Sequence, residues 1–392
     1  MTETMTTLEL TFWLCSAGIV YTFAGYPVWM WLRAKLWPRP VRRCCESLAA
    51  DLPMCSIVIV GHNEAANLDH KLRNLLASKR ADRIAEILVG SDGSTDDTPG
   101  VIASVGDSRV RLLSWPERRG KAAGLNECVP AATSDIVILA DARQEFDPAA
   151  IGELLANFAD NEVGVVSGEL MFRAANSHTA ASDGIGIYWR YEKFLRKCEA
   201  RTGSVPGATG AIYAIRKHLF RPIPTTTILD DVAIPMQAIE QGYRCVFEER
   251  AIAFDDPSQS TGQEAIRKRR TIAGAAQLVR LYPRWLLPWR NPIWLTFVSH
   301  KLARLVSPVL LVGAFATNIG LAAPNRPLFV SLLAIQVWFY LAAVVGWMFQ
   351  QTGRKSALFG APLMFLSLNT TTVAALWDAV RGRYRVTWRK AA

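Results

Sequence analysis

The sequence lacks the motifs that mark several large enzyme classes. No Gly-x-Gly-x-x-Gly follows a predicted strand, and Gly120-Lys121 has neither the upstream glycine nor the trailing Ser or Thr of a P-loop. The seven cysteines include no Cys-x-x-Cys pair and no zinc-ligand spacing, and the chain contains no internal repeat or low-complexity segment. A dehydrogenase and a P-loop nucleotide hydrolase are therefore disfavoured, and the cysteines are predicted to be reduced, mostly buried thiols.

Charge is also scarce, and it is unevenly distributed. Charged residues make up only 20% of the 392 residues, against 51% for apolar ones, so the chain is too apolar to be disordered. The apolar residues concentrate at the two ends and the charged residues in the middle. This pattern predicts a soluble α/β domain over residues 53–280, held between a transmembrane helix at 1–35 and further transmembrane helices within 305–392.

The N-terminal apolar stretch, residues 10–32, contains 23 consecutive uncharged residues, and about 20 residues suffice to cross a bilayer. A cleaved signal peptide would have a basic start and a small-residue cleavage site. This segment instead begins with Glu3 and Glu9 and ends in the bulky Trp29 and Trp31. It is therefore predicted to be a retained transmembrane helix.

The formal net charge of +10 follows the membrane edges, which indicates a membrane surface as its partner and argues against nucleic acid. A basic juxtamembrane segment follows the first apolar stretch and runs into the linker predicted at 36–52. By the positive-inside rule it places the following domain in the cytoplasm. Its basic residues are Arg33, Lys35, Arg39, Arg42 and Arg43.

Three further apolar stretches, at about 305–323, 328–349 and 357–377, predict two or three C-terminal helices. The segment before them, 281–304, mixes Trp with Arg and Lys and is predicted to lie along the bilayer interface. Three crossings would place the tail outside, whereas its basic residues would keep it in the cytoplasm, so the last stretch is either transmembrane or re-entrant and interfacial. The basic residues of the tail are Arg381, Arg383, Arg385, Arg389 and Lys390.

The middle of the chain alternates short β-branched runs with helical patterns. The predicted strands are 55–60, 84–89, 110–113 and 135–140. Such alternation implies right-handed crossovers and a mostly parallel sheet, in which ligands bind at the carboxyl ends of the strands. Glu64, Asp92 and Asp141 follow strand ends directly, so these three side chains are expected to converge on one crevice.

Acidic residues at strand ends suit the binding of a divalent cation and of a nucleotide. Asp92 stands in a Gly-Ser-Asp-Gly-Ser turn and could equally be a turn or capping residue, but Asp141 follows an apolar strand that forces its carboxylate outward. Lys121 and Asn126 lie at the start of a helix, where a lysine can cover a diphosphate or simply cap the helix.

Three further groups carry candidate chemistry. Gly207 and Gly210 would let a backbone approach a substrate, or would form a tight turn. Asp230-Asp231 could supply a carboxylate general base for a hydroxyl, or cap a helix. The basic run that contains Arg267 and Arg270 could clamp a pyrophosphate or bind anionic lipid headgroups; it reads Arg267-Lys-Arg-Arg270.

In this order the motifs resemble the membrane-bound family-2 glycosyltransferases of the inverting GT-A class that build bacterial exopolysaccharides. The resemblance covers roughly residues 50–280 and rests on five segments in sequence. They are Ser56-Ile-Val-Ile-Val-Gly-His-Asn-Glu64, Asp92-Gly-Ser, Gly120-Lys121 through Leu125-Asn126, Gly207 to Arg216, and Asp230-Asp231.

The resemblance implies a GT-A nucleotide-sugar-binding fold and an integral protein of the bacterial inner membrane with a cytoplasmic catalytic domain. It implies that Asp92 binds the nucleoside, that Asp141 holds the diphosphate with Mg²⁺ or Mn²⁺, and that Asp231 is the base. Glu64, Lys121, Asn126 and the two arginines would complete the donor site, and Gly207 and Gly210 would contact the acceptor. The implied partners are a nucleotide-diphosphate sugar, a lipid-linked or glycan acceptor and membrane lipids.

Two departures from the family pattern leave alternatives open. Where the family has Asp-x-Asp, this chain has Asp141-Ala-Arg143, and Arg143 cannot be a metal ligand. It would contact a phosphate or an acidic sugar, or pair with Asp92 or Glu145. The Gln-x-x-Arg-Trp motif of processive members is also missing, which argues against processive synthesis.

Two alternative functions stay open for this sequence. One is an inactive scaffold of a polysaccharide assembly, and the other is a transferase that acts on polyprenyl phosphate.

Overall fold

The computed structural model describes residues 5–44, 51–173, 180–256, 261–323, 325–352 and 356–381. Residues 45–50 of the predicted linker lie outside these ranges, as do the tail residues Arg383, Arg385, Arg389 and Lys390.

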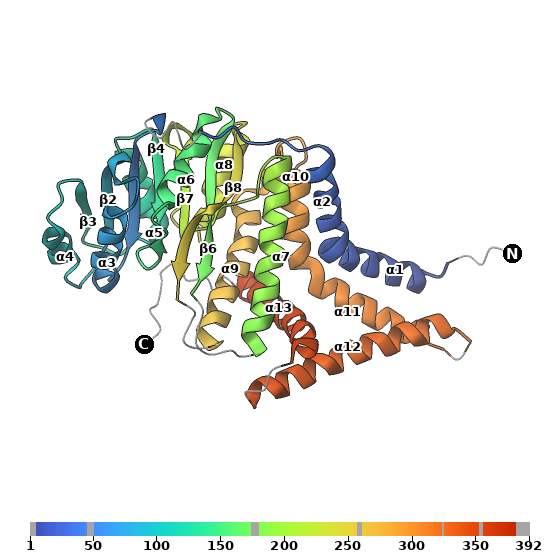
Figure 1. Ribbon diagram of the computed structural model, residues 1–392. Helices are drawn as coiled ribbons and strands as arrows, with labels where there is room; N and C mark the ends of the chain where they lie inside the picture. Colours follow the sequence, from blue (N-terminus) through green and yellow to red (C-terminus); the bar gives the residue numbers. More distant parts are fainter. Residues whose placement is uncertain are drawn as a thin grey trace.

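The middle of the chain forms an α/β domain around one sheet with the strand order β3-β2-β1-β4-β7-β6-β8-β5 (Figure 1). Neighbouring strands are parallel from β3 to β4 and between β6 and β8, whereas β7 and β5 run antiparallel to their neighbours. The predicted mostly parallel sheet is therefore confirmed. The strands are β1 (Cys55–Gly61), β2 (Ile84–Asp92), β3 (Val110–Trp115), β4 (Ile136–Ala140), β5 (Glu145–Phe146), β6 (Val163–Phe172), β7 (Ile212–Arg216) and β8 (Arg244–Asp255).

Helices cover both faces of this sheet, which explains why β1 is buried from Cys55 to Val60 and its apolar residues do not alternate. Ile57 and Ile59 belong to a core shared with α3 and α6, whereas Val58 and Val60 belong to a second core shared with α5 and α8. The helices of the domain are α3 (Ala65–Leu76), α4 (Thr98–Val105), α5 (Lys121–Ala131), α6 (Ala150–Ala156), α7 (Ala180–Thr202), α8 (Asp230–Glu240) and α9 (Thr261–Leu281).

Among the described residues, four helices are long and apolar enough to cross a membrane, judged by length and composition. The first, Thr7–Leu36, consists of α1 (Thr7–Val20) and α2 (Tyr26–Leu36) joined by a π-helical turn, and bends between them (Figure 1). The other three contain α11 (Ala303–Leu321), α12 (Pro327–Gln351) and α13 (Ala357–Val380). The stretch predicted at 357–377 is thus one continuous helix of 24 residues.

The segment 281–304, predicted to lie along the bilayer interface, has two structurally different parts. Pro283–Leu286 is a short 3₁₀ turn, but from Trp294 the chain is helical through α10 (Trp294–Phe297) and a π-helical turn into α11. Phe297 and His300 are buried there, although the mixed composition of the segment suggested a surface position.

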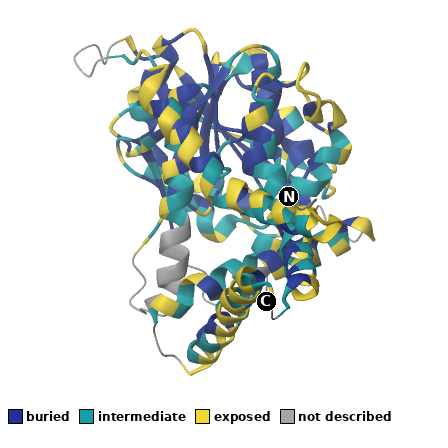
Figure 2. Cartoon of the chain, turned by 90° about the vertical axis from the view of Figure 1, so that its right-hand side faces the viewer, coloured by how far each residue is buried: buried dark blue, intermediate teal, exposed yellow. Residues whose placement is uncertain are grey.

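The two parts of the molecule differ in what they expose. Buried residues concentrate in the sheet and its covering helices, whereas the long helices at the other end carry many exposed residues (Figure 2). These include large apolar side chains such as Val309, Val312 and Trp338. Apolar side chains left open along long helices fit a lipid environment.

The α/β domain meets the four candidate membrane helices through α7 and α9. Helix α7 packs against α2 and α13, and α9 packs along α13 (Figure 1). At the α7 contact, the fully buried Glu199 accepts hydrogen bonds from the Tyr26 hydroxyl at 2.7 Å and from His300 Nδ1 at 2.8 Å. The other ring nitrogen of His300 lies 3.0 Å from Glu192, which also pairs with Arg304. We call these five residues the junction network.

Candidate active site

Asp92, at the carboxyl end of β2, ties that strand to the turn before α5. The side chain is buried, and its two oxygens accept hydrogen bonds from the backbone N–H groups of Arg119 at 2.8 Å and Gly120 at 2.7 Å. The next residue, Gly93, has φ +63°, and a Cβ there would lie 2.6 Å from the backbone nitrogen of Arg118. The Asp92-Gly93 pair therefore fixes the loop that carries Lys121 into the site.

Replacing Asp92 by Ala is expected to destabilise the domain, because the buried N–H of Gly120 and the partly buried N–H of Arg119 lose their acceptor. Unsatisfied donors of this kind cost about 1–3 kcal/mol, and each kcal/mol lowers Tm by about 2–4 °C in a domain of this size. Thermal unfolding of the purified protein measures this loss. The matched control is Asp69→Ala, which removes an exposed carboxylate paired with Arg73 on the same helix and is expected to leave Tm nearly unchanged.

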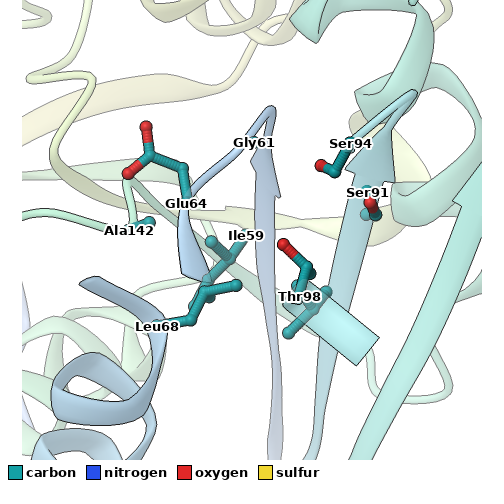
Figure 3. A pocket seen from close by; sticks show the side chains of 10 residues that line it. Ile59, Gly61, Glu64, Leu68, Ser91, Ser94, Thr98 and Ala142 are labelled. Carbon is teal, nitrogen blue, oxygen red and sulfur yellow. The ribbon is translucent and has the colours of Figure 1, made fainter. Parts of the chain in front are cut away.

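A small hollow opens at the carboxyl ends of β1 and β2 (Figure 3). Ile59 and Leu68 give it an apolar side, and Ser91, Ser94 and Thr98 give it hydroxyl groups. Glu64 stands at its edge with its carboxylate accepting from Asn67 Nδ2 at 2.5 Å; the remaining lining residues are Gly61, Val89, Gly90 and Ala142. The hollow marks the carboxyl edge of the parallel strands, the edge at which ligands bind in open α/β sheets.

Lys121, the first residue of α5, contacts Asp141, which directly follows β4. The Lys121 ammonium lies 2.7 Å from Asp141 Oδ1 and 3.5 Å from Asp230 Oδ2. Burial alone would lower the pKa of Lys121, but the two carboxylates outweigh it and raise that pKa above its ordinary value. The lysine is therefore a permanent positive charge between two carboxylates.

Asp231 is the second residue of α8 and packs on the glycine-rich segment before β7. Its carbonyl accepts a hydrogen bond from Ala208 N–H at 2.7 Å, and a Cβ on Gly210 would lie 3.2 Å from Asp231 Oδ2. Gly207, with φ +133°, makes the turn that brings this segment to the aspartate. The structure thus places the two predicted acceptor glycines directly against the predicted base.

The environment of the Asp231 carboxylate is suited to a base. Burial and the neighbouring charge of Asp230 raise the pKa of Asp231 to about 6, against the opposing charges of Lys121 and Lys301. Asp231 Oδ1 is buried, and no hydrogen-bond donor of the described residues reaches it. A carboxylate oxygen of raised basicity and without a donor partner can take a proton from a bound hydroxyl.

Helix α9 holds the loop in front of this aspartate pair. Gln277 on α9 accepts from Ile228 N–H at 3.0 Å and donates to the Thr226 carbonyl at 2.8 Å. A Cβ on Gly274 would lie 2.7 Å from the Leu229 side chain, so the glycine permits close packing there. On its far side, α9 is joined to α13 by an ion pair between Arg269 and Asp378 at 2.5 Å.

The two predicted arginines of α9 occupy different positions. Burial lowers the pKa of Arg270, and the opposing charges of Asp230, Asp141 and Asp231 offset this only in part. Arg267 lies farther out, 3.9 Å from Asp255 and over the Phe172 ring.

Asn126 uses its amide to hold another loop. Its Nδ2 donates to the Ile223 carbonyl at 2.7 Å, and its Oδ1 accepts from Ile223 N–H at 2.9 Å. Both ends of the amide are thus engaged with the backbone that leads to Asp230. Its predicted contact with the donor stays a prediction, and the structure adds this positioning role.

Arg143 pairs with Asp255, so the predicted pairing with Asp92 or Glu145 is wrong. Its guanidinium donates to both oxygens of the buried Asp255, at 3.0 and 2.7 Å, and Gln144 adds a third hydrogen bond at 3.0 Å. Asp92 is unavailable because the backbone occupies its carboxylate, and Glu145 is paired with Arg173 and His70.

Two residues in this region escaped the sequence analysis. Asp255 ends β8 directly after the apolar Ala251–Phe254 run, which is the same signal that drew attention to Asp141. Lys71 on α3 is buried; it donates to the Gln144 carbonyl at 2.7 Å and lies 3.5 Å from the centre of the Phe146 ring. Burial lowers the pKa of Lys71 to about 7. In the sequence, Lys71 is one residue of an ordinary helical pattern, and nothing there marks it as part of a site.

The side chains present do not fit the predicted metal site at Asp141 well. Magnesium and manganese prefer several oxygen ligands, but one oxygen of Asp141 already binds the Lys121 ammonium, and Arg143 is cationic. Within the described ranges, no group of three or more His, Cys, Asp or Glu side chains is placed to hold a metal ion.

The fold and site together define a GT-A-like α/β domain attached to long apolar helices. Residues 56–223 match the model of the family described as glycosyl transferase family 2. The chain therefore contains a glycosyl transferase family 2 domain, and the resemblance seen in its motifs is confirmed.

The chain is similar to two curated relatives and one solved structure. It is 25% identical over 209 residues to the poly-beta-1,6-N-acetyl-D-glucosamine synthase of Staphylococcus aureus (strain COL), covering 52% of this chain and 50% of that protein. It is 34% identical over 110 residues to the succinoglycan biosynthesis protein ExoU of Rhizobium meliloti (strain 1021), covering 28% and 31%. The chain spans about half the length, or less, of these relatives.

The structural similarity extends over nearly the whole chain. The mannosyltransferase PcManGT from Pyrobaculum calidifontis, solved in complex with GDP-Man and Mn²⁺, superposes with a TM-score of 0.69 and 21% identity, covering 95% of this chain and 100% of that one. This agreement confirms the fold, including helices outside the catalytic domain.

Proposed function

We propose that this protein is a membrane-anchored, inverting glycosyltransferase that moves a sugar from a nucleotide-diphosphate donor to a hydroxyl group of an acceptor. The observation that carries the proposal is the convergence of Lys121, Asp141, Asp230 and Asp231, with the ammonium between the Asp141 and Asp230 carboxylates and the Asp231 base next to them. The two exopolysaccharide proteins that the chain resembles support a role in the synthesis of extracellular polysaccharide.

In this mechanism the donor nucleotide binds over the carboxyl ends of β1 and β2, with Glu64 placed for the ribose hydroxyls. The diphosphate lies toward Lys121 and Arg270, whose positive charges stabilise the developing negative charge of the leaving group. Asp231 accepts the proton of the acceptor hydroxyl, whose oxygen forms a bond to the anomeric carbon as the bond to the diphosphate breaks. One displacement inverts the anomeric configuration and releases the nucleoside diphosphate.

The acceptor is proposed to be a lipid-linked saccharide, with the catalytic domain on the cytoplasmic side of the bacterial inner membrane. The Asp230-Asp231 loop is held by α9, which itself packs along α13, one of the four candidate membrane helices. The base would thus act close to the bilayer. The basic residues after the first helix support the orientation.

Thermal unfolding of detergent-purified protein with UDP, GDP, dTDP or CMP tests the donor site. A nucleotide at about 100 times its dissociation constant stabilises the folded state by about 2.7 kcal/mol. We expect one nucleotide to raise Tm selectively. If no nucleotide raises Tm, the transferase proposal fails and an inactive scaffold becomes the better interpretation.

A further inference from the structure

The position of Lys121 bears on how the donor's diphosphate is neutralised. Its ammonium lies 2.7 Å from Asp141 and 3.5 Å from Asp230, and a third carboxylate, Asp231, acts on its charge. A divalent cation would need these same carboxylate oxygens as ligands. The lysine therefore already occupies, with one positive charge, the place between the carboxylates that such a cation would take.

The residue two places beyond Asp141 excludes the usual second ligand. Arg143 is held by two hydrogen bonds to the buried Asp255, and its side chain remains 54% exposed. A guanidinium cannot coordinate a metal, but it can bind phosphate oxygens with its remaining N–H groups. Arg270 adds another positive charge from α9, the helix that holds the loop before Asp230 through Gln277.

We propose that Lys121, assisted by Arg270 and Arg143, supplies the positive charge that a divalent cation would otherwise bring to the donor's diphosphate. Nucleotide binding and sugar transfer then do not require a metal. The inference rests on the proposed function, since it concerns the same donor site. An ammonium fixed between two carboxylates is preorganised, so it needs no rearrangement when the leaving group becomes charged.

The wild-type protein, dialysed against EDTA, gives the first test. We expect the selected nucleotide to raise Tm by the same amount in EDTA and in Mn²⁺. A rise that appears only with Mn²⁺ or Mg²⁺ overturns the metal-free inference but leaves the transferase proposal intact. No rise in either condition contradicts both proposals, so the two failures are distinguishable.

The Lys121→Ala variant gives a second test, in which the protein is expected to gain affinity for Mn²⁺. Removing the ammonium leaves Asp141, Asp230 and Asp231 without their shared counter-charge, so Mn²⁺ affinity should rise at least about tenfold, a change of about 1.4 kcal/mol. Electron paramagnetic resonance of free Mn²⁺ measures this without any activity assay. Lys121→Arg is the matched control, because it keeps the charge and should bind Mn²⁺ as weakly as the wild type.

The same variants separate a charge role from a merely structural one. Lys121→Ala should lose the nucleotide-dependent rise of Tm in EDTA and recover part of it in Mn²⁺, whereas Lys121→Arg should retain most of it in EDTA. If the wild type binds Mn²⁺ as tightly as Lys121→Ala, the lysine does not compete with a cation and the inference is wrong. If Lys121→Ala does not fold, the wild-type comparison in EDTA and Mn²⁺ still decides.

Discussion

Replacing Asp231 by Asn is expected to reduce the turnover of sugar transfer by about 10²–10⁴-fold, the usual contribution of a general base. The amide keeps the size of the carboxylate and cannot accept the hydroxyl proton. Nucleotide binding should survive, because the diphosphate lies toward Lys121 and Arg270. Transfer of labelled sugar from the donor to extracted lipid-linked acceptors, followed over time, measures the loss.

Two variants make this experiment specific. Asp230→Asn should have a smaller effect on turnover, because Asp230 faces Lys121 at 3.5 Å and supports the base chiefly through its charge. Asp69→Asn, an exposed carboxylate on α3, should behave as the wild type. Full turnover by Asp231→Asn with polyprenyl phosphate as acceptor would contradict the base assignment and favour a phosphate acceptor, which is already anionic.

The pH dependence of kcat/KM should report the same group. Asp231 acts as a base only when it is deprotonated, and burial with the Asp230 charge raises its pKa to about 6. Activity is therefore expected to be constant above that pH and to fall as pH drops through 6, about tenfold per unit for one essential base. An acid limb near pH 4, the range of an ordinary aspartate, would show that another group controls the rate.

Much of the predicted donor site could be located from the sequence, because the patterns that mark its strands and their ends are local. Continuous apolar runs that stop at a polar residue predicted β1, β2 and β4, and the crossovers of a parallel sheet bring their ends together. Asp92 and Asp141 follow two of these runs directly. Their approximate positions depend only on neighbours in sequence, which the alternation of strands and helices makes visible.

The partners of the site residues could not be predicted, because they come from distant parts of the chain. Arg143 pairs with Asp255 across 112 positions, and Asn126 binds Ile223 across 97. Both long-range contacts depend on which strand lies beside which, and the antiparallel placement of β7 and β5 breaks the simple repeat. Residue type limits the possible chemistry, but the topology of the sheet decides which donors and acceptors meet.

The junction between the catalytic domain and the membrane helices should be as sensitive as the active site. Glu199 on α7 is fully buried and accepts from Tyr26 on α2 and from His300 in the helical segment before α11. The other His300 nitrogen faces the Glu192 carboxylate at 3.0 Å. Through these two carboxylates, His300 ties α7 to the helical segment before α11.

Glu199→Ala is accordingly expected to destabilise the protein by about 1–3 kcal/mol for each buried hydrogen-bonding group that loses its acceptor. It leaves the Tyr26 hydroxyl and His300 Nδ1 buried without that acceptor. Glu199→Gln, which keeps one acceptor oxygen, should lie between this variant and the wild type in Tm. The matched control is Glu162→Ala, because Glu162 forms an exposed ion pair with Arg39 and should contribute little.

The junction network lies on the same helix as a contact to the active site, so changes in it should also affect turnover. Arg196 lies one turn of α7 from both Glu192 and Glu199, and it donates to Thr209 at 2.8 Å and to Ser167 at 2.6 Å, beside Gly210. Loosening α7 should therefore disturb the segment that packs on Asp231, so Glu199→Gln should lower kcat even where it still folds and binds nucleotide. A variant with reduced Tm but unchanged kcat would show that the junction serves stability alone and does not position the base.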